Sequence, residues 1–145
     1  MRWTPPALVV AILLAAGPVL AASPAPQLTS AEAAAIHDVI AAQLRAFRSD
    51  DSAQAFAYAS PAIQSIFKNP DTFMSMVRNT YQAVYRPREF EFRDLVPVEG
   101  RWTQRVLVVG ADGVPVVAEY VMERQPDGSW RIDGCVMERS TEATT

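Results

Sequence analysis

The chain has 145 residues, of which 50% are hydrophobic and 20% are charged, and its formal net charge at pH 7 is −3. This length allows one domain with a single core, and the composition excludes a wholly disordered chain. The negative charge argues against nucleic acid and anionic lipid as partners, because both are bound through basic surfaces.

The first 21 residues have the pattern of a cleavable secretory signal peptide. Arg2 supplies a positive start, residues 7–16 are all apolar, and Gly17-Pro18 precedes a small-residue site that ends at Ala21. A retained anchor is the weaker alternative, because a membrane span needs about 20 apolar residues. We therefore expect cleavage after Ala21 and a periplasmic or secreted protein with no stable membrane anchor.

Residues 22–29 form a proline-broken leader that we expect to be extended, and the first helix begins beside it. Thr29 and Glu32 make the T-x-x-E pattern of a capping box. Apolar residues then recur at helical spacing and predict a buried stripe on a helix that ends near Arg48. This stripe consists of Ile36, Ile40, Leu44 and Phe47.

Three short helices are predicted next, each with its own start signal. Asp50 or Asp51 can cap a helix over about residues 52–59, and Ser60-Pro61 and Asn69-Pro70 begin two more. The paired carboxylates also suggest a metal or acid–base site, but alternate positions carry no further oxygen ligands, so capping explains them better. The residues that give these helices their apolar edges are Phe56, Ile63, Ile66, Phe67, Phe73, Met74, Val77 and Tyr81.

A linker over residues 81–88 leads into a region where apolar and polar residues alternate, which is the period of β-strands. Four antiparallel strands are predicted there. We expect a bulge near Asp94, because the alternation changes phase, and turns at Gly100 and at residues 111–113 and 126–128.

The turn lengths predict the registers of two hairpins. The first loop pairs Val108 with Val116, and the second pairs Tyr120 with Gly134. One face of the sheet is then apolar and should meet the helices: Trp102, Val106, Val108, Val116, Ala118, Tyr120, Met122, Ile132 and Val136. The second face mixes charged residues with Leu107, Val109, Val117, Val121, Cys135 and Met137. We expect a homodimer or a ligand to cover that face.

Helices followed by an antiparallel sheet predict an α+β fold, in which the N-terminal helices pack on one face of a curved four-stranded antiparallel sheet. Residues 30–139 should form this single domain, and residues 140–145 should form a disordered tail.

Short motifs spread along the chain carry a resemblance to a known family. They are Ala46-Phe47 before Asp50-Asp51, Ala55-Phe56, Ala59-Ser60-Pro61, Ile63-Gln64, Phe67, Tyr85-Arg86-Pro87, Gln104-Arg105-Val106 and the run from Asp127 to Cys135. On these motifs, residues 36–138 resemble an exported bacterial family, domain-of-unknown-function family 4864, which implies no activity because the family has none assigned. The order of elements is also similar to the cone-shaped, cystatin-like fold of nuclear transport factor two, ketosteroid isomerase and polyketide cyclases. That resemblance implies an interior pocket, although three short helices in a row depart from the fold.

The best candidate for a ligand-binding site combines Tyr81, Tyr85, Arg86, Arg88 and Arg105. Aromatic rings and planar guanidinium groups recognise carboxylates and other anions well. The alternative interpretation is structural, with Tyr85 and Arg86 holding the linker against the helices.

Catalytic and metal sites have less support. His37 is the only histidine and should be a solvated helix residue, and the only cysteine, Cys135, should be a buried and inert thiol. An isomerase-like site would need a carboxylate and a tyrosine in an apolar pocket. The residues that could supply these groups are Tyr58, Tyr81, Tyr85, Tyr120, Asp94, Glu119 and Asp133.

We therefore expect an exported, non-catalytic module that binds a small ligand or a protein partner. The alternative is a small cofactor-independent enzyme of the isomerase or cyclase kind. No cofactor and no metal is expected, because phosphate-binding loops and zinc motifs are absent from the sequence.

Overall fold

A computed structural model describes Gly17 and residues 27–141 of the chain. Apart from Gly17, the predicted signal peptide with its cleavage site lies outside the described residues, as do most of the leader and residues 142–145 of the predicted tail. No helix in the described part is long and apolar enough to cross a membrane.

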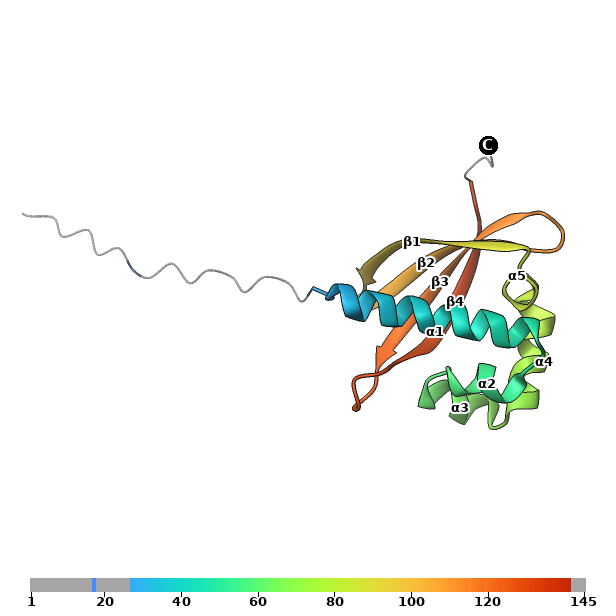
Figure 1. The fold of residues 1–145 in the computed structure, drawn as a ribbon, viewed down its shortest axis with the longest axis horizontal. Helices are drawn as coiled ribbons and strands as arrows, with labels where there is room; N and C mark the ends of the chain where they lie inside the picture. Colours follow the sequence, from blue (N-terminus) through green and yellow to red (C-terminus); the bar gives the residue numbers. More distant parts are fainter. Residues whose placement is uncertain (1–16, 18–26, 142–145) are drawn as a thin grey trace, which may run out of the picture.

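The described chain contains a set of helices followed by an open, four-stranded antiparallel sheet of order β1-β2-β3-β4, which confirms the α+β prediction. Figure 1 shows α1 lying across one face of the sheet, with α2, α3 and α4 gathered near its C-terminal end. The elements are α1 (Ser30–Arg48), α2 (Ser52–Ala57), α3 (Pro61–Phe67), α4 (Pro70–Thr80), α5 (Gln82–Tyr85), β1 (Glu89–Val98), β2 (Arg101–Val109), β3 (Pro115–Arg124) and β4 (Trp130–Arg139).

The predicted cap residues start the helices. Thr29 and Glu32 form both hydrogen bonds of the capping box at α1. The side chains of Asp51, Ser60 and Asn69 accept backbone N–H groups at the starts of α2, α3 and α4. Each cap satisfies a donor that the first helical turn leaves free, so the sequence breaks the chain into short helices at these positions.

The core lies between α1 and the sheet. The predicted stripe on α1 is at most 2% exposed, and it meets Val106, Val108, Ala118 and Tyr120 from the inner face of the sheet. Phe73 joins the other helices to this core, because its ring lies 5.4 Å from that of Phe56 and 5.7 Å from that of Phe67. These contacts bury the apolar surface that stabilises the fold.

Two helical predictions need correction. Ile66, assigned to the apolar edge of the third helix, is 67% exposed, and α3 contacts the core through Ile63 and Phe67 alone among the three residues of that edge. Residues 82–85, expected in a linker, form the short helix α5. A helix of four residues is only about one turn long, so apolar residues cannot recur in it at helical spacing.

The bulge predicted near Asp94 is confirmed, and a buried glutamine side chain forms hydrogen bonds to its backbone. The register shifts between Phe92 and Leu95, and the buried Gln104 side chain donates from Nε2 to the carbonyl oxygens of Arg93, Asp94 and Arg105. Its Oε1 lies 2.9 Å from Nε2 of His37, and the His37 ring stacks on Phe92. The prediction of a solvated His37 is therefore wrong, because this side chain packs between α1 and the sheet.

The hairpin registers are confirmed except at one point. Val108 pairs with Val116, as predicted, and this register also places Arg105 opposite Glu119. Tyr120, however, pairs with Cys135 rather than with Gly134, because Asp133 is an extra residue in β4 opposite the Val121–Met122 step.

This β4 bulge reverses the faces assigned to the end of the chain, because a one-residue slip turns every following side chain over. Cys135 and Met137 pack against the core on the helix side, whereas Val136 is 55% exposed. The assignment of these three residues to their faces was thus wrong.

Candidate functional site

The structure brings together only two of the five residues predicted to form a binding site. Tyr85 and Arg86 are neighbours at the end of α5, whereas Tyr81 lines an apolar pocket on the other side of that helix. Arg88 lies beside Gly113 in the β2–β3 loop. Arg105 is on the helix-free face of the sheet, where its guanidinium pairs with Glu119 at 3.0 Å and lies 3.7 Å from Asp94.

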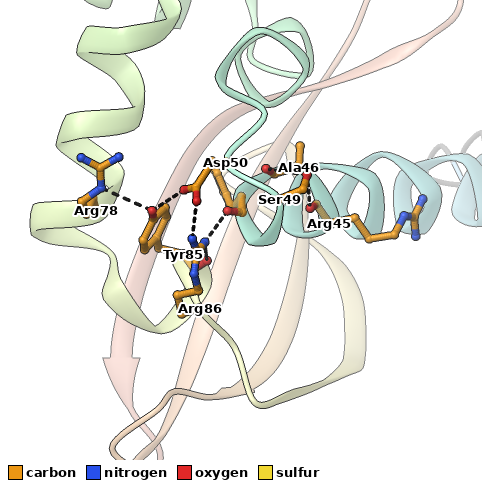
Figure 2. A network of polar contacts seen from close by, with 8 residues as sticks. Arg45, Ala46, Ser49, Asp50, Arg78, Tyr85 and Arg86 are labelled. Atoms are coloured by element: carbon orange, nitrogen blue, oxygen red, sulfur yellow. Dashed lines mark hydrogen bonds and ion pairs between the residues drawn. The ribbon is translucent and has the colours of Figure 1, made fainter.

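A network of polar contacts surrounds Tyr85 and Arg86 (Figure 2). The Tyr85 hydroxyl donates to one carboxylate oxygen of Asp50, and Arg86 Nη2 donates to the other at 2.8 Å. Arg86 Nη1 also donates to the backbone oxygen of Phe47 at the end of α1, and the Arg86 guanidinium carbon lies 4.0 Å from the centre of the Tyr85 ring. Arg78 Nε, from α4, donates to the Tyr85 hydroxyl oxygen at 3.3 Å.

The charge of Asp50 and the backbone geometry of its turn both indicate that this network has a structural role. The hydrogen bond from Tyr85, followed by that from Arg86, lowers the pKa of Asp50 below its usual value. Asp50 has φ of 54°, so the turn after α1 passes through the left-handed region, which aspartate tolerates better than most residues. The contacts fasten α5 to the end of α1, as the structural interpretation of Tyr85 and Arg86 predicted.

An apolar pocket of about 360 Å³ lies between α3, α4 and β4. Its wall includes Phe67 and Phe73 from the helices, and Ile132 from the sheet. Ile66 and Val136, which are 67% and 55% exposed, also line it. None of the described residues in its lining is charged.

Tyr120 is the polar group of interest in this pocket. The side chain is 1% exposed, and its hydroxyl has no hydrogen-bond partner within the described part of the chain. Burial, followed by the neighbouring Cys135, raises the pKa of Tyr120 well above its usual value, so the hydroxyl keeps its proton. Because a buried hydroxyl normally has a partner, this one is a free hydrogen-bonding group in an apolar wall.

Two other polar side chains line the same pocket. Gln43, which is 3% exposed, donates from Nε2 to the backbone oxygen of Ala55 at 3.1 Å. Burial, followed by the nearby Glu119 carboxylate, raises the pKa of the Cys135 thiol to about 12, so the thiol stays protonated. The side chain is half-buried, however, rather than fully buried as predicted. The alternation of apolar residues placed Tyr120 correctly on the inner face of the sheet. It placed Cys135 on the opposite face, because it did not reveal the β4 bulge.

The groups expected for catalysis are engaged elsewhere. Asp133 accepts from the Ser60 hydroxyl and pairs with Arg101. Burial raises the pKa of Asp133, but these two partners outweigh it, and the pKa lies below the usual value. Tyr58 is hydrogen-bonded to Gln54 at 2.9 Å. Within residues 27–141, the pocket lining contains no carboxylate and no histidine beside its tyrosines, and no group of three possible ligands could hold a metal ion.

The chain is similar to one family of known proteins. The family model "Domain of unknown function (DUF4864)" matches residues 29–145. No curated protein and no solved structure matches the chain. The model covers all of the helices and strands described above, and the chain therefore belongs to the DUF4864 family.

Proposed function

We propose that this domain binds a small, neutral and mainly apolar molecule in the pocket between α3, α4 and β4. The single observation that carries the proposal is the Tyr120 hydroxyl, which is buried without a hydrogen-bond partner among the described residues that surround an open apolar pocket. An unpaired buried hydroxyl costs about 1–3 kcal/mol, and a ligand oxygen would remove that cost.

The size and lining of the pocket define the ligand further. A volume of about 360 Å³ lies within the usual range of small-molecule sites. A ligand of one or two fused rings with a single hydroxyl or carbonyl group fits such a wall, because the uncharged lining offers no partner to an ion. The exposed Ile66 and Val136 give the pocket an apolar rim that a ligand would cover.

Binding without catalysis is the preferred function, with an isomerase-like enzyme as the alternative. The enzyme would need a carboxylate near Tyr120, and the lining within the described residues offers none. Helices over one face of a sheet with a pocket between them also support the proposal of a cone-like domain. We also propose that the protein is exported, because residues 1–21 have the pattern of a signal peptide.

A partner protein remains part of the proposal. Leu107, Val117 and Val121 are half-buried on the helix-free face, which supports a homodimer there, although Met137 no longer contributes to that face. Sedimentation of the protein at high concentration tests this point, and a strict monomer would count against it.

Two probes that differ by one hydroxyl test the ligand proposal. Naphthalene and 2-naphthol are titrated into the protein, and binding is followed by NMR chemical shifts. The wild type should prefer 2-naphthol, and Tyr120→Phe should weaken 2-naphthol about five- to tenfold without affecting naphthalene, as expected for one hydrogen bond.

Tyr81→Phe is the matched control, since Tyr81 lines the same pocket but is only half-buried. This variant should leave both affinities unchanged. The proposal is wrong if neither probe binds saturably, or if Tyr120→Phe weakens both probes equally.

A further inference from the structure

A second concave site lies on the other side of α4 and α5. A groove of about 620 Å³ runs between these helices, the β2–β3 loop and the ends of β3 and β4. Arginines from three separate elements line it: Arg78 of α4, Arg86 at the end of α5, and Arg139 at the end of β4. In a chain with a net charge of −3, this is a local concentration of positive charge.

The β4 bulge explains why Arg139 belongs to this group. Arg139 pairs with Val116, whose side chain packs against the core on the helix side of the sheet. Opposite residues of an antiparallel pair share a face, so Arg139 lies on that side too, in line with Met137. Without the extra residue at Asp133, Arg139 would belong to the opposite face.

The hydrogen bonds show which of the arginines are available. Arg86 is engaged by Asp50 and by backbone oxygens, so it contributes charge but few free donors. Arg78 donates from Nε to the Tyr85 hydroxyl, and Figure 2 draws no hydrogen bond or ion pair from its two terminal nitrogens to the other residues shown. Arg139 forms no ion pair or hydrogen bond through its side chain with another described residue, and both side chains are exposed.

The rest of the groove suits an organic anion better than an inorganic one. Its lining includes Ala83, Ala111 and Val116, and Val114 is 41% exposed. Asp112 is the acidic residue in the described lining, and one of its oxygens already accepts the backbone N–H of Val114 at 3.0 Å. An apolar body could lie on these side chains while an anionic group reaches the arginines.

We propose that this groove binds a small organic carboxylate, held by Arg78 and Arg139 and resting against Val114 and the β2–β3 loop. The planar guanidinium group matches a carboxylate in shape and offers two parallel N–H donors. This site is separate from the neutral pocket, because Tyr81 and Val84 line the pocket, whereas Ala83 and Tyr85 line the groove.

Benzoate and its neutral counterpart benzyl alcohol test the proposal, with binding followed by NMR chemical shifts at low ionic strength. Benzoate should bind saturably and shift residues of the β2–β3 loop, whereas benzyl alcohol should not. Arg78→Gln and Arg139→Gln should each weaken benzoate about fivefold, which is the upper range for an exposed ion pair. Raising the salt concentration to about 0.5 M should weaken the binding of benzoate to the wild type as well.

Arg45→Gln is the matched control, because Arg45 is exposed on α1 and its side chain points away from the network in Figure 2. This variant should bind benzoate like the wild type. The unfolding temperature of each of the three variants is measured alongside, so that a loss of binding in a variant that is folded at the assay temperature reports on the groove.

Four results would overturn the proposal. They are the absence of saturable benzoate binding, equal binding of benzyl alcohol, an equal loss in Arg45→Gln, and sulfate binding as tightly as benzoate. The last result would assign the groove to inorganic anions.

Discussion

Replacing Tyr120 by phenylalanine should stabilise the domain, although most substitutions in a core destabilise it. The side chain is 1% exposed and its hydroxyl has no hydrogen-bond partner among the described residues, so the folded state keeps a polar group that water would solvate in the unfolded chain. Phenylalanine has the same ring and lacks this group.

The expected size follows from two opposing effects. Removing an unsatisfied buried hydroxyl gains about 1–3 kcal/mol. The lost oxygen leaves a space of roughly 20 Å³, which costs about 0.5 kcal/mol if the wall does not close. The free energy of unfolding should therefore rise by about 1 kcal/mol or somewhat more, and the midpoint of thermal unfolding should rise by about 4 °C for a domain of this size.

Urea unfolding followed by tryptophan fluorescence measures the effect, because Trp130 is 6% exposed and reports on the core. The midpoint should rise while the slope stays constant. Tyr81→Phe, on the same pocket, should change the free energy of unfolding by less than about 0.5 kcal/mol. A loss of stability of about 1 kcal/mol in Tyr120→Phe would show that the hydroxyl is hydrogen-bonded. The ligand proposal would then lose the observation on which it rests.

Three further predictions concern the groups that hold the sheet. Gln104→Leu should lower the free energy of unfolding by about 3 kcal/mol in urea titrations, because His37 and the carbonyl oxygens of the β1 bulge lose their partner. The pKa of Asp133 in the folded protein lies below its ordinary value of 3.8, so the ionised carboxylate stabilises the fold above pH 3.8, and this contribution is lost as the pH falls through the folded pKa. In Asp133→Asn, the urea midpoint should therefore fall less between pH 6 and pH 2 than it does in the wild type. Cys135, with its pKa raised to about 12, should react with Ellman's reagent at pH 8 about 40-fold more slowly in the native than in the unfolded chain, and equal rates would contradict the raised pKa.

The sequence predicted the helices that begin with local signals. Thr29, Asp51, Ser60 and Asn69 each accept a backbone N–H three residues further on, so the residues that decide these helix starts are adjacent in the chain. The β2–β3 hairpin was predictable for the same reason, because its loop places Gly113 at φ of 77°, a conformation that glycine adopts readily.

The β4 bulge could not be predicted in this way, because its partners are distant in the sequence. The Ser60 hydroxyl donates to Asp133 across 73 positions, and the backbone groups of Tyr58 and Ser60 form hydrogen bonds with Ile132. A sequence pattern shows which residues alternate, but it does not show which strand gains a residue when another segment pairs with its edge. The wrong faces of Cys135 and Val136 have this single cause.

The same bulge links the two sites. Beyond Asp133 it turns Cys135 toward the neutral pocket, and four residues later it turns Arg139 toward the basic groove. Two of the motifs that carry the family resemblance, Ala59-Ser60-Pro61 and the run from Asp127 to Cys135, meet at this bulge, where Ala59 pairs with Ile132 and the Ser60 hydroxyl donates to Asp133. Their role is therefore one of register: they decide which side chains of β4 face the helices. The α4–α5 segment lies between the two sites, and Asp50 fastens it to α1 by accepting hydrogen bonds from Tyr85 and Arg86. The acidic turn, whose paired carboxylates first suggest a metal site, therefore holds the segment that separates the pocket from the groove.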